Sequence, residues 1–182
     1  LRNVEMAYRN RCNGVFLIGH GLAADYVLDV AKQVKHAFPN FWLGVNFLDL
    51  SPEQSLERLE WAKNQNLYIE GLWCDSVGID EDVETGRLFA NELQDIAQLR
   101  AELEWSGLLF GGVAFKYQRP IKNFKKAAEL ARNYIDIVTT SGDATAVPPD
   151  PEKIKIMAAA ANPKCLAIAS GLDAENVRLF PD

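Results

Sequence analysis

Short apolar runs alternate with amphipathic segments along the chain, and this alternation predicts strands that are each followed by a helix. Strands are predicted at 13–19, 41–47, 67–74, 108–115, 135–140 and 165–169. Helices are predicted at 1–11, 25–38, 52–66, 86–105, 124–134 and 151–161, with a last helix opening near Ala174. A helix followed by six βα units, with near-continuous apolar strands, indicates an α/β fold with a parallel sheet.

Two architectures fit this order, a (β/α)8 TIM barrel and an open doubly wound sheet. We favour the barrel because glycines and the charged residue Glu70 fall inside predicted strands, Glu70 near a carboxyl end. Six strands are fewer than the eight of a barrel. We therefore expect one domain over residues 1–182 that lacks the first strand and the last βα unit of the barrel.

Composition narrows the classes of partner. The net charge of −6 and the pI of about 5.0, without a basic stripe, argue against a nucleic-acid partner. Three cysteines without framework spacing predict free thiols in a reducing compartment, and hence a cytoplasmic protein. No apolar run reaches the roughly 18 residues of a membrane span. A homo-oligomer stays an open alternative.

The turn after the last predicted strand is a candidate phosphate site. Asp173 is placed to cap a helix that begins at Ala174, and backbone N–H groups at a helix start bind anions. A glycine lets the backbone approach a ligand closely. The predicted phosphate-binding residues are Ser170 and Gly171, with Ser141 and Gly142 from the preceding strand. An ordinary capped βα turn would explain the same residues.

Polar residues at the predicted strand ends are the candidates for chemistry. Lys116 would neutralise a phosphate or carboxylate or, with a lowered pKa, act as a base or Schiff-base nucleophile. Glu70 and Asp143 would act as general acid or base across the barrel mouth. The alternatives without a role in chemistry are a solvated side chain for Lys116, an ion pair inside the barrel for Glu70 and a turn-forming role for Asp143. Further ligand contacts are predicted for His20, Asn46 and Thr140.

Metal and cofactor chemistry has weaker signals. The acidic segment at 75–84 contains Asp75, Asp80, Glu81, Asp82 and Glu84, which would suit Mg²⁺ but more often form a solvated loop. The two histidines have no zinc-ligand spacing, so no metal site is predicted and the cofactor stays unknown. The phosphate-binding P-loop, the Gly-x-Ser-x-Gly elbow and the Gly-x-Gly-x-x-Gly fingerprint are absent from the sequence, which disfavours the enzyme classes that depend on them.

Two late segments, SGDATAVPPD at 141–150 and SGLDAENV at 170–177, resemble motifs of the BtpA family of TIM-barrel proteins. Leu43-Gly44-Val45-Asn46, Val113-Ala114-Phe115-Lys116 and Gly86-Arg87 look like further elements of that family. The later motif is also similar to the phosphate loops of ribulose-phosphate-binding barrels. The chain differs from the family pattern at Tyr117, where histidine is usual, and at Glu70, where arginine is usual.

The resemblance implies a TIM barrel that binds a phosphorylated small molecule, a phosphosugar or nucleotide-like compound, at the carboxyl ends of its strands. It leaves the reaction open among isomerase, lyase and glycosyl-transferring activities. The alternative is a non-catalytic, BtpA-like assembly or regulatory factor.

Overall fold

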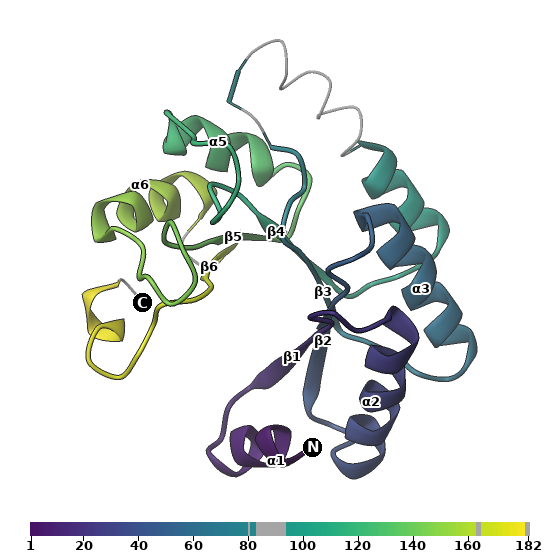
Figure 1. The fold of residues 1–182 in the computed structure, drawn as a ribbon. Coiled ribbons are helices and arrows are strands. Elements are labelled where there is room, and N and C mark those ends of the chain that lie inside the picture. Colours follow the sequence, from purple (N-terminus) through teal and green to yellow (C-terminus); the bar gives the residue numbers. More distant parts are fainter. Residues whose placement is uncertain (80, 83–93, 163–164, 181–182) are drawn as a thin grey trace. The chain divides into compact units, whose positions relative to one another are not determined.

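The computed structural model describes residues 1–79, 81–82, 94–162 and 165–180, and it confirms the α/β class. Parallel strands alternate with helices along these ranges (Figure 1). The elements are α1 (Arg2–Arg9), β1 (Gly14–Ile18), α2 (Ala24–Ala37), β2 (Trp42–Asn46), α3 (Pro52–Asn64), β3 (Gly71–Cys74), β4 (Leu108–Gly112), α5 (Phe124–Ala131), β5 (Ile137–Thr140), α6 (Pro151–Ala161) and β6 (Leu166–Ile168). Residues 94–102 are also helical, and a 3₁₀ turn covers Val177–Leu179.

The chain divides into two compact units. The first holds Leu1–Cys74 and Ile96–Leu109, and the second holds Asp75–Asp95 and Phe110–Asp182. In the first unit β1 pairs with β2 and β2 with β3; in the second β4 pairs with β5 and β5 with β6, and every pair is parallel. Strand order follows chain order within each unit, so neither contains the reversal of a doubly wound sheet.

Helix positions follow from the apolar stripes that the sequence contains. In the first unit α2 turns Val27, Leu28, Ala31 and Val34 inward and packs on β1 and β2, while α3 packs on β3 (Figure 1). The start of α3 is fixed by a capping box, in which Ser51 and Gln54 satisfy each other's backbone N–H groups. In the second unit, buried alanines on both α5 and α6 let these two helices pack against each other.

None of the helices that the structure describes is long and apolar enough to cross a membrane.

Two aromatic rings, Phe16 and Trp42, cover glycines on the first sheet. Phe16 contacts Trp42 and Trp73 edge-on, with ring centroids 5.1 and 5.4 Å away. Gly44 lies beside Phe16 in the β1–β2 ladder and beside Gly71 in the β2–β3 ladder. A Cβ atom at Gly44 would overlap the Phe16 ring. The glycines inside these strands therefore make room for aromatic packing.

We expect Gly44→Ala to lower the free energy of unfolding by about 1–3 kcal/mol, because the added methyl displaces the Phe16 ring. Urea denaturation measures the loss. In a Phe16→Ala background the same change should cost less, since the clashing ring is gone. Equal costs in both backgrounds would contradict this account of the packing.

Candidate functional site

Loops at the carboxyl ends of β4, β5 and β6 hold the candidate site of the second unit. Four residues of these loops have left-handed backbone, namely Ala114 (φ 49°), Tyr117 (φ 65°), Ala146 (φ 64°) and Ser170 (φ 80°). Residues other than glycine adopt this conformation at a cost, and such strain concentrates at binding and catalytic sites. Strained backbone therefore occurs in all three loops at this end of the sheet.

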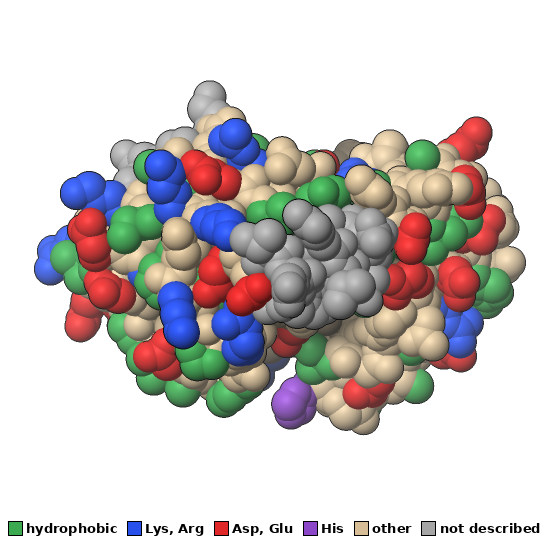
Figure 2. Space-filling model, turned by 90° about the horizontal axis from the view of Figure 1, so that it is seen from above, with side chains coloured by type: hydrophobic (Ala, Val, Ile, Leu, Met, Phe, Trp, Pro, Cys, Tyr) green, Lys and Arg blue, Asp and Glu red, His purple; other side chains and the backbone are tan. Residues whose placement is uncertain are grey.

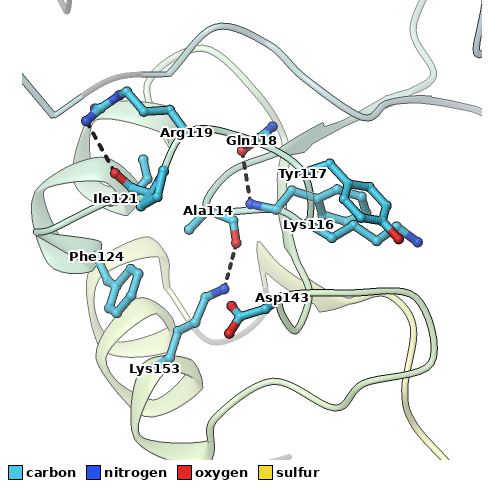
Figure 3. A pocket seen from close by; sticks show the side chains of 11 residues that line it. Ala114, Lys116, Tyr117, Gln118, Arg119, Ile121, Phe124, Asp143 and Lys153 are labelled. Atoms are coloured by element: carbon cyan, nitrogen blue, oxygen red, sulfur yellow. Dashed lines mark hydrogen bonds between the residues drawn. The ribbon is translucent and has the colours of Figure 1, made fainter.

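A cavity of about 350 Å³ lies beneath the β4–α5 loop. Residues 114–121 of that loop, Phe124 at the start of α5, Asp143 after β5 and Lys153 on α6 form its wall (Figure 3). The cavity is thus built from two consecutive βα connections, with charged side chains on its wall.

Lys153 is the buried charge of this cavity. It occupies the third position of α6, a helix that begins with Pro151 after the Asp150 side chain caps the Glu152 N–H at 2.9 Å. Lys153 is 9% exposed, and its Nζ donates to the carbonyl oxygens of Ala114 at 2.6 Å and Ser141 at 2.7 Å. Both carbonyls lie just beyond strand ends, so the ammonium group ties the β4–α5 and β5–α6 connections together.

Burial lowers the pKa of the Lys153 ammonium below its usual range, because an ion in the protein interior loses hydration. The carboxylates of Asp143 and Asp150 act in the opposite direction, since negative charge favours the protonated form. Burial is the larger effect, and the amine is therefore easier to deprotonate than a surface lysine.

Thr140 and Ser141, which are predicted ligand contacts, fix the backbone around Lys153. Both are fully buried. Thr140 donates from Oγ1 to the Ala114 carbonyl at 3.1 Å. Ser141 Oγ donates to the Gly142 carbonyl at 2.7 Å and accepts the Lys116 N–H at 2.8 Å. These side chains position the cavity wall.

Lys116 and Asp143, both predicted as catalytic residues, line the cavity, but their side chains are placed differently. The Lys116 ammonium lies 5.5 Å from the Phe115 ring centre, and its side chain runs beside Tyr117, away from Lys153 (Figure 3). Asp143 points toward the Lys153 ammonium (Figure 3). Lys153, which sequence reasoning missed, holds the interior position foreseen for Lys116.

The sequence does contain a signal for Lys153. This lysine precedes Met157 by four residues and Ala161 by eight, and all three are buried on one face of α6. A lysine on the apolar face of a helix is unusual, because burying an ammonium is costly without acceptors.

The predicted phosphate turn uses many of its polar groups internally. Ser170 Oγ accepts the Ala146 N–H at 2.9 Å. One oxygen of Asp173 accepts the N–H groups of Glu175 at 2.9 Å and Asn176 at 2.8 Å. The α-helix predicted from Ala174 is wrong, because residues 174–176 form a turn that leads into the three-residue 3₁₀ turn. The predicted set of helical N–H donors is therefore absent from this turn.

Gly142 and Gly171 allow two loops to pack tightly. A Cβ at Gly142 would overlap the carbonyl oxygen of Val147, and one at Gly171 would overlap the peptide between Val147 and Pro148. Gly171 also has a φ of 74°, which favours glycine. The close backbone approach predicted for a phosphate is made here by the protein's own β5–α6 loop.

Glu70 lies at the opposite end of its strand from the predicted mouth, because β3 begins only at Gly71. Its carboxylate pairs with Lys35 of α2 and accepts the Leu43 N–H at 3.1 Å. The prediction extended the strand back to Leu67 because Leu67 and Ile69 are apolar, and both are buried although they precede β3. Glu70 therefore braces the amino ends of β2 and β3 and does not reach the carboxyl ends.

The other two predicted contacts belong to the first unit. His20 is exposed after β1, whereas Asn46 is 3% exposed at the end of β2, where its carbonyl accepts the Gly19 N–H at 2.9 Å. Their parts in ligand binding stay predictions.

The acidic segment contributes an ion pair to the rim of the cavity. Glu81 accepts from the Arg119 guanidinium and the Lys122 N–H at 2.7 and 2.8 Å. Asp80 and Glu84 lie outside the described residues. Within the ranges that the structure describes, no three or more His, Cys, Asp and Glu side chains are grouped to hold a metal ion. In Figure 2 most Lys and Arg side chains lie toward the left of the face with Asp and Glu among them, while Asp and Glu predominate toward the right.

No protein-family model matches the chain, and no curated protein matches it. The likeness to the BtpA family thus stays a prediction from the motifs.

Glu70→Gln is expected to lower the free energy of unfolding by about 1–2 kcal/mol, because it weakens a charged, part-buried interaction with Lys35. Glu104→Gln is the matched control, since Glu104 is 86% exposed and 4.0 Å from Lys63. It should change stability by less than about 0.5 kcal/mol. An unchanged stability for Glu70→Gln, measured by urea unfolding, would contradict the bracing role.

Lys153 should make stability depend on alkaline pH. Between its lowered folded-state pKa and the ordinary value of about 10.4, the unfolded chain holds more protons on this residue than the folded chain. The free energy of unfolding therefore rises with pH in that window through this group. Relative to wild type, Lys153→Met should lose this rise, while Lys155→Met, at an exposed site on the same helix, should keep it. The free energy of unfolding is measured by urea denaturation at several pH values in the window. The same pH dependence in all three proteins would contradict the assignment.

Proposed function

We propose that this chain binds a phosphorylated small molecule in the cavity between the β4–α5 loop and the start of α6. The observation that carries the proposal is the buried ammonium of Lys153 in the wall of that cavity. Parallel α/β folds bind ligands beyond the carboxyl ends of their strands, where this cavity lies. A volume of about 350 Å³ is small for a ligand pocket, so a phosphosugar fits better than a larger nucleotide.

The charges around the cavity favour an anion. Lys116, Arg119 and Lys153 contribute positive charge to its wall, against one lining carboxylate, Asp143. Glu81 partly neutralises Arg119 from outside the wall. A phosphate that enters would offer acceptors to the remaining donor position of Lys153 and to the Arg119 guanidinium, which already donates to Glu81 and the Pro120 carbonyl. This arrangement supports phosphate recognition by side chains in place of the predicted turn.

We also propose that the fold belongs to the (β/α)8 barrel type. The sequential order of parallel strands in each unit supports a barrel over a doubly wound sheet, because the latter reverses its strand order. With Asp143 beside the buried amine, the site is equipped for proton transfer, and we propose an enzyme of the isomerase, lyase or glycosyl-transferring classes.

A thermal-shift panel tests the binding proposal. Phosphate, sulfate and glycerol 3-phosphate are added singly, each with and without Mg²⁺. A ligand at 100 times its dissociation constant should stabilise the fold by about 2.7 kcal/mol. The shift should shrink in Lys116→Ala and vanish in Lys153→Met, each compared with its own unliganded form. Lys125→Ala, at an exposed position on α5, is the control that should keep the full shift.

A flat panel with a folded protein would contradict phosphate binding and favour the non-catalytic, BtpA-like factor. The observation that favours this alternative is the turn at Ser170, whose hydroxyl group is bonded to the protein's own backbone. A shift that survives in Lys153→Met but disappears in Ser170→Ala would move the site to that turn.

A further inference from the structure

The amine of Lys153 is held in one orientation at the cavity. A lysine nitrogen is tetrahedral and is bonded to one carbon, which leaves three positions for hydrogens or a lone pair. The carbonyls of Ala114 and Ser141 occupy two of them, at 2.6 and 2.7 Å. Lys153 lines the cavity together with Phe124, whose ring centre lies 5.5 Å from Nζ, and the third position is the one that the two carbonyl bonds leave for a bound molecule.

Deprotonation leaves this anchoring intact. A neutral amine has two hydrogens, enough to keep both carbonyl hydrogen bonds, and its lone pair then takes the third position. Burial favours that neutral form, while Asp143 and Asp150 oppose it. The geometry therefore presents an oriented lone pair to whatever fills the cavity.

We propose that Lys153 is a nucleophile that forms an imine with the carbonyl carbon of a small phosphorylated aldehyde or ketone bound in this cavity. The proposal rests on the proposed function for the phosphate group of that molecule. The carbonyl group is an added requirement, which the anion site alone does not impose.

The chemistry balances without an oxidant or reductant. The lone pair of Nζ attacks the carbonyl carbon, a C–N bond forms, and the carbonyl oxygen takes one amine proton to give a carbinolamine. The second amine proton then passes to the hydroxyl group, which leaves as water as the C=N bond forms. Asp143, whose carboxylate points toward the amine, is placed to relay these protons (Figure 3). Protonation of the imine nitrogen restores one N–H for a backbone carbonyl.

Two probes with the same phosphate separate the imine from anion binding. Dihydroxyacetone phosphate carries a ketone, whereas glycerol 3-phosphate has a hydroxyl group in its place. The unmodified chain is incubated with each and with cyanoborohydride, which reduces an imine to a stable amine. We expect one adduct per chain with the ketone, mapped to Lys153 by tandem mass spectrometry, and none with glycerol 3-phosphate.

Lys155, on the same helix with a side chain 76% exposed, is the internal control. Because burial lowers the pKa of Lys153, a larger share of this amine is neutral near neutral pH, and we expect more label on Lys153 than on Lys155. Because the mapping uses the unmodified chain, it does not depend on whether a variant folds. Lys153→Arg, which keeps the charge, should remove the adduct.

Label spread over surface lysines, or none on Lys153, would overturn the imine proposal. If glycerol 3-phosphate still stabilised the chain in that case, the proposed phosphate site would stand and the nucleophile alone would fail. If neither compound stabilised or labelled the chain, both proposals would fail.

Discussion

The hydrogen bonds from Lys153 to the carbonyls of Ala114 and Ser141 hold the carboxyl-end loops of the second unit in place. An ammonium transferred from water to a protein interior loses hydration, and its burial is tolerated only when acceptors replace the lost water. Two carbonyls supply acceptors, and the charges of Asp143 and Asp150 help to offset the loss. The left-handed conformation of Ala114 brings its carbonyl within reach of both Lys153 and Thr140. The strained residue Ala114 thus supplies an acceptor for the buried charge.

The loops around the cavity are built largely from their own polar groups. Ser141 bonds to both neighbouring connections, Ser170 accepts from the β5–α6 loop, and Asp173 closes its own turn. Groups satisfied in this way do not need a ligand to hold their shape. A site preorganised by its own hydrogen bonds spends little ordering entropy when a ligand binds.

Periodicity predicted the elements well, because each strand and helix carries an apolar run or stripe of the right length. Ser51 and Asp150 each precede a proline at the first position of a helix, a pattern typical of a helix start, and their side-chain caps are present. Strand ends were harder to locate: buried Leu67 and Ile69 extended β3 backwards and put Glu70 at the wrong end of the strand. Asp173 was recognised as a cap, but its acceptor closes a turn, and no α-helix follows.

The site was harder to predict than the fold because it depends on contacts between distant residues. Lys116 follows a strand and looked like the reactive lysine, yet the buried amine comes from Lys153, 39 residues away from Ala114 in the chain. Local sequence rules cannot show which carbonyl a lysine meets. Gly142 and Gly171 were ambiguous for a related reason. A glycine makes room equally for a bound ligand and for a neighbouring loop, and here the β5–α6 loop takes that room.

The central claim is that Lys153 presents an easily deprotonated amine to a ligand cavity, and lysine-selective NMR tests it most directly. With ¹³C at the ε-carbon of every lysine, the signal assigned by its loss in Lys153→Arg should titrate at lower pH than the others. It should also move when glycerol 3-phosphate is added, while that of Lys155 stays in place. A Lys153 signal that titrates together with the surface lysines and ignores the phosphate ester would contradict the account.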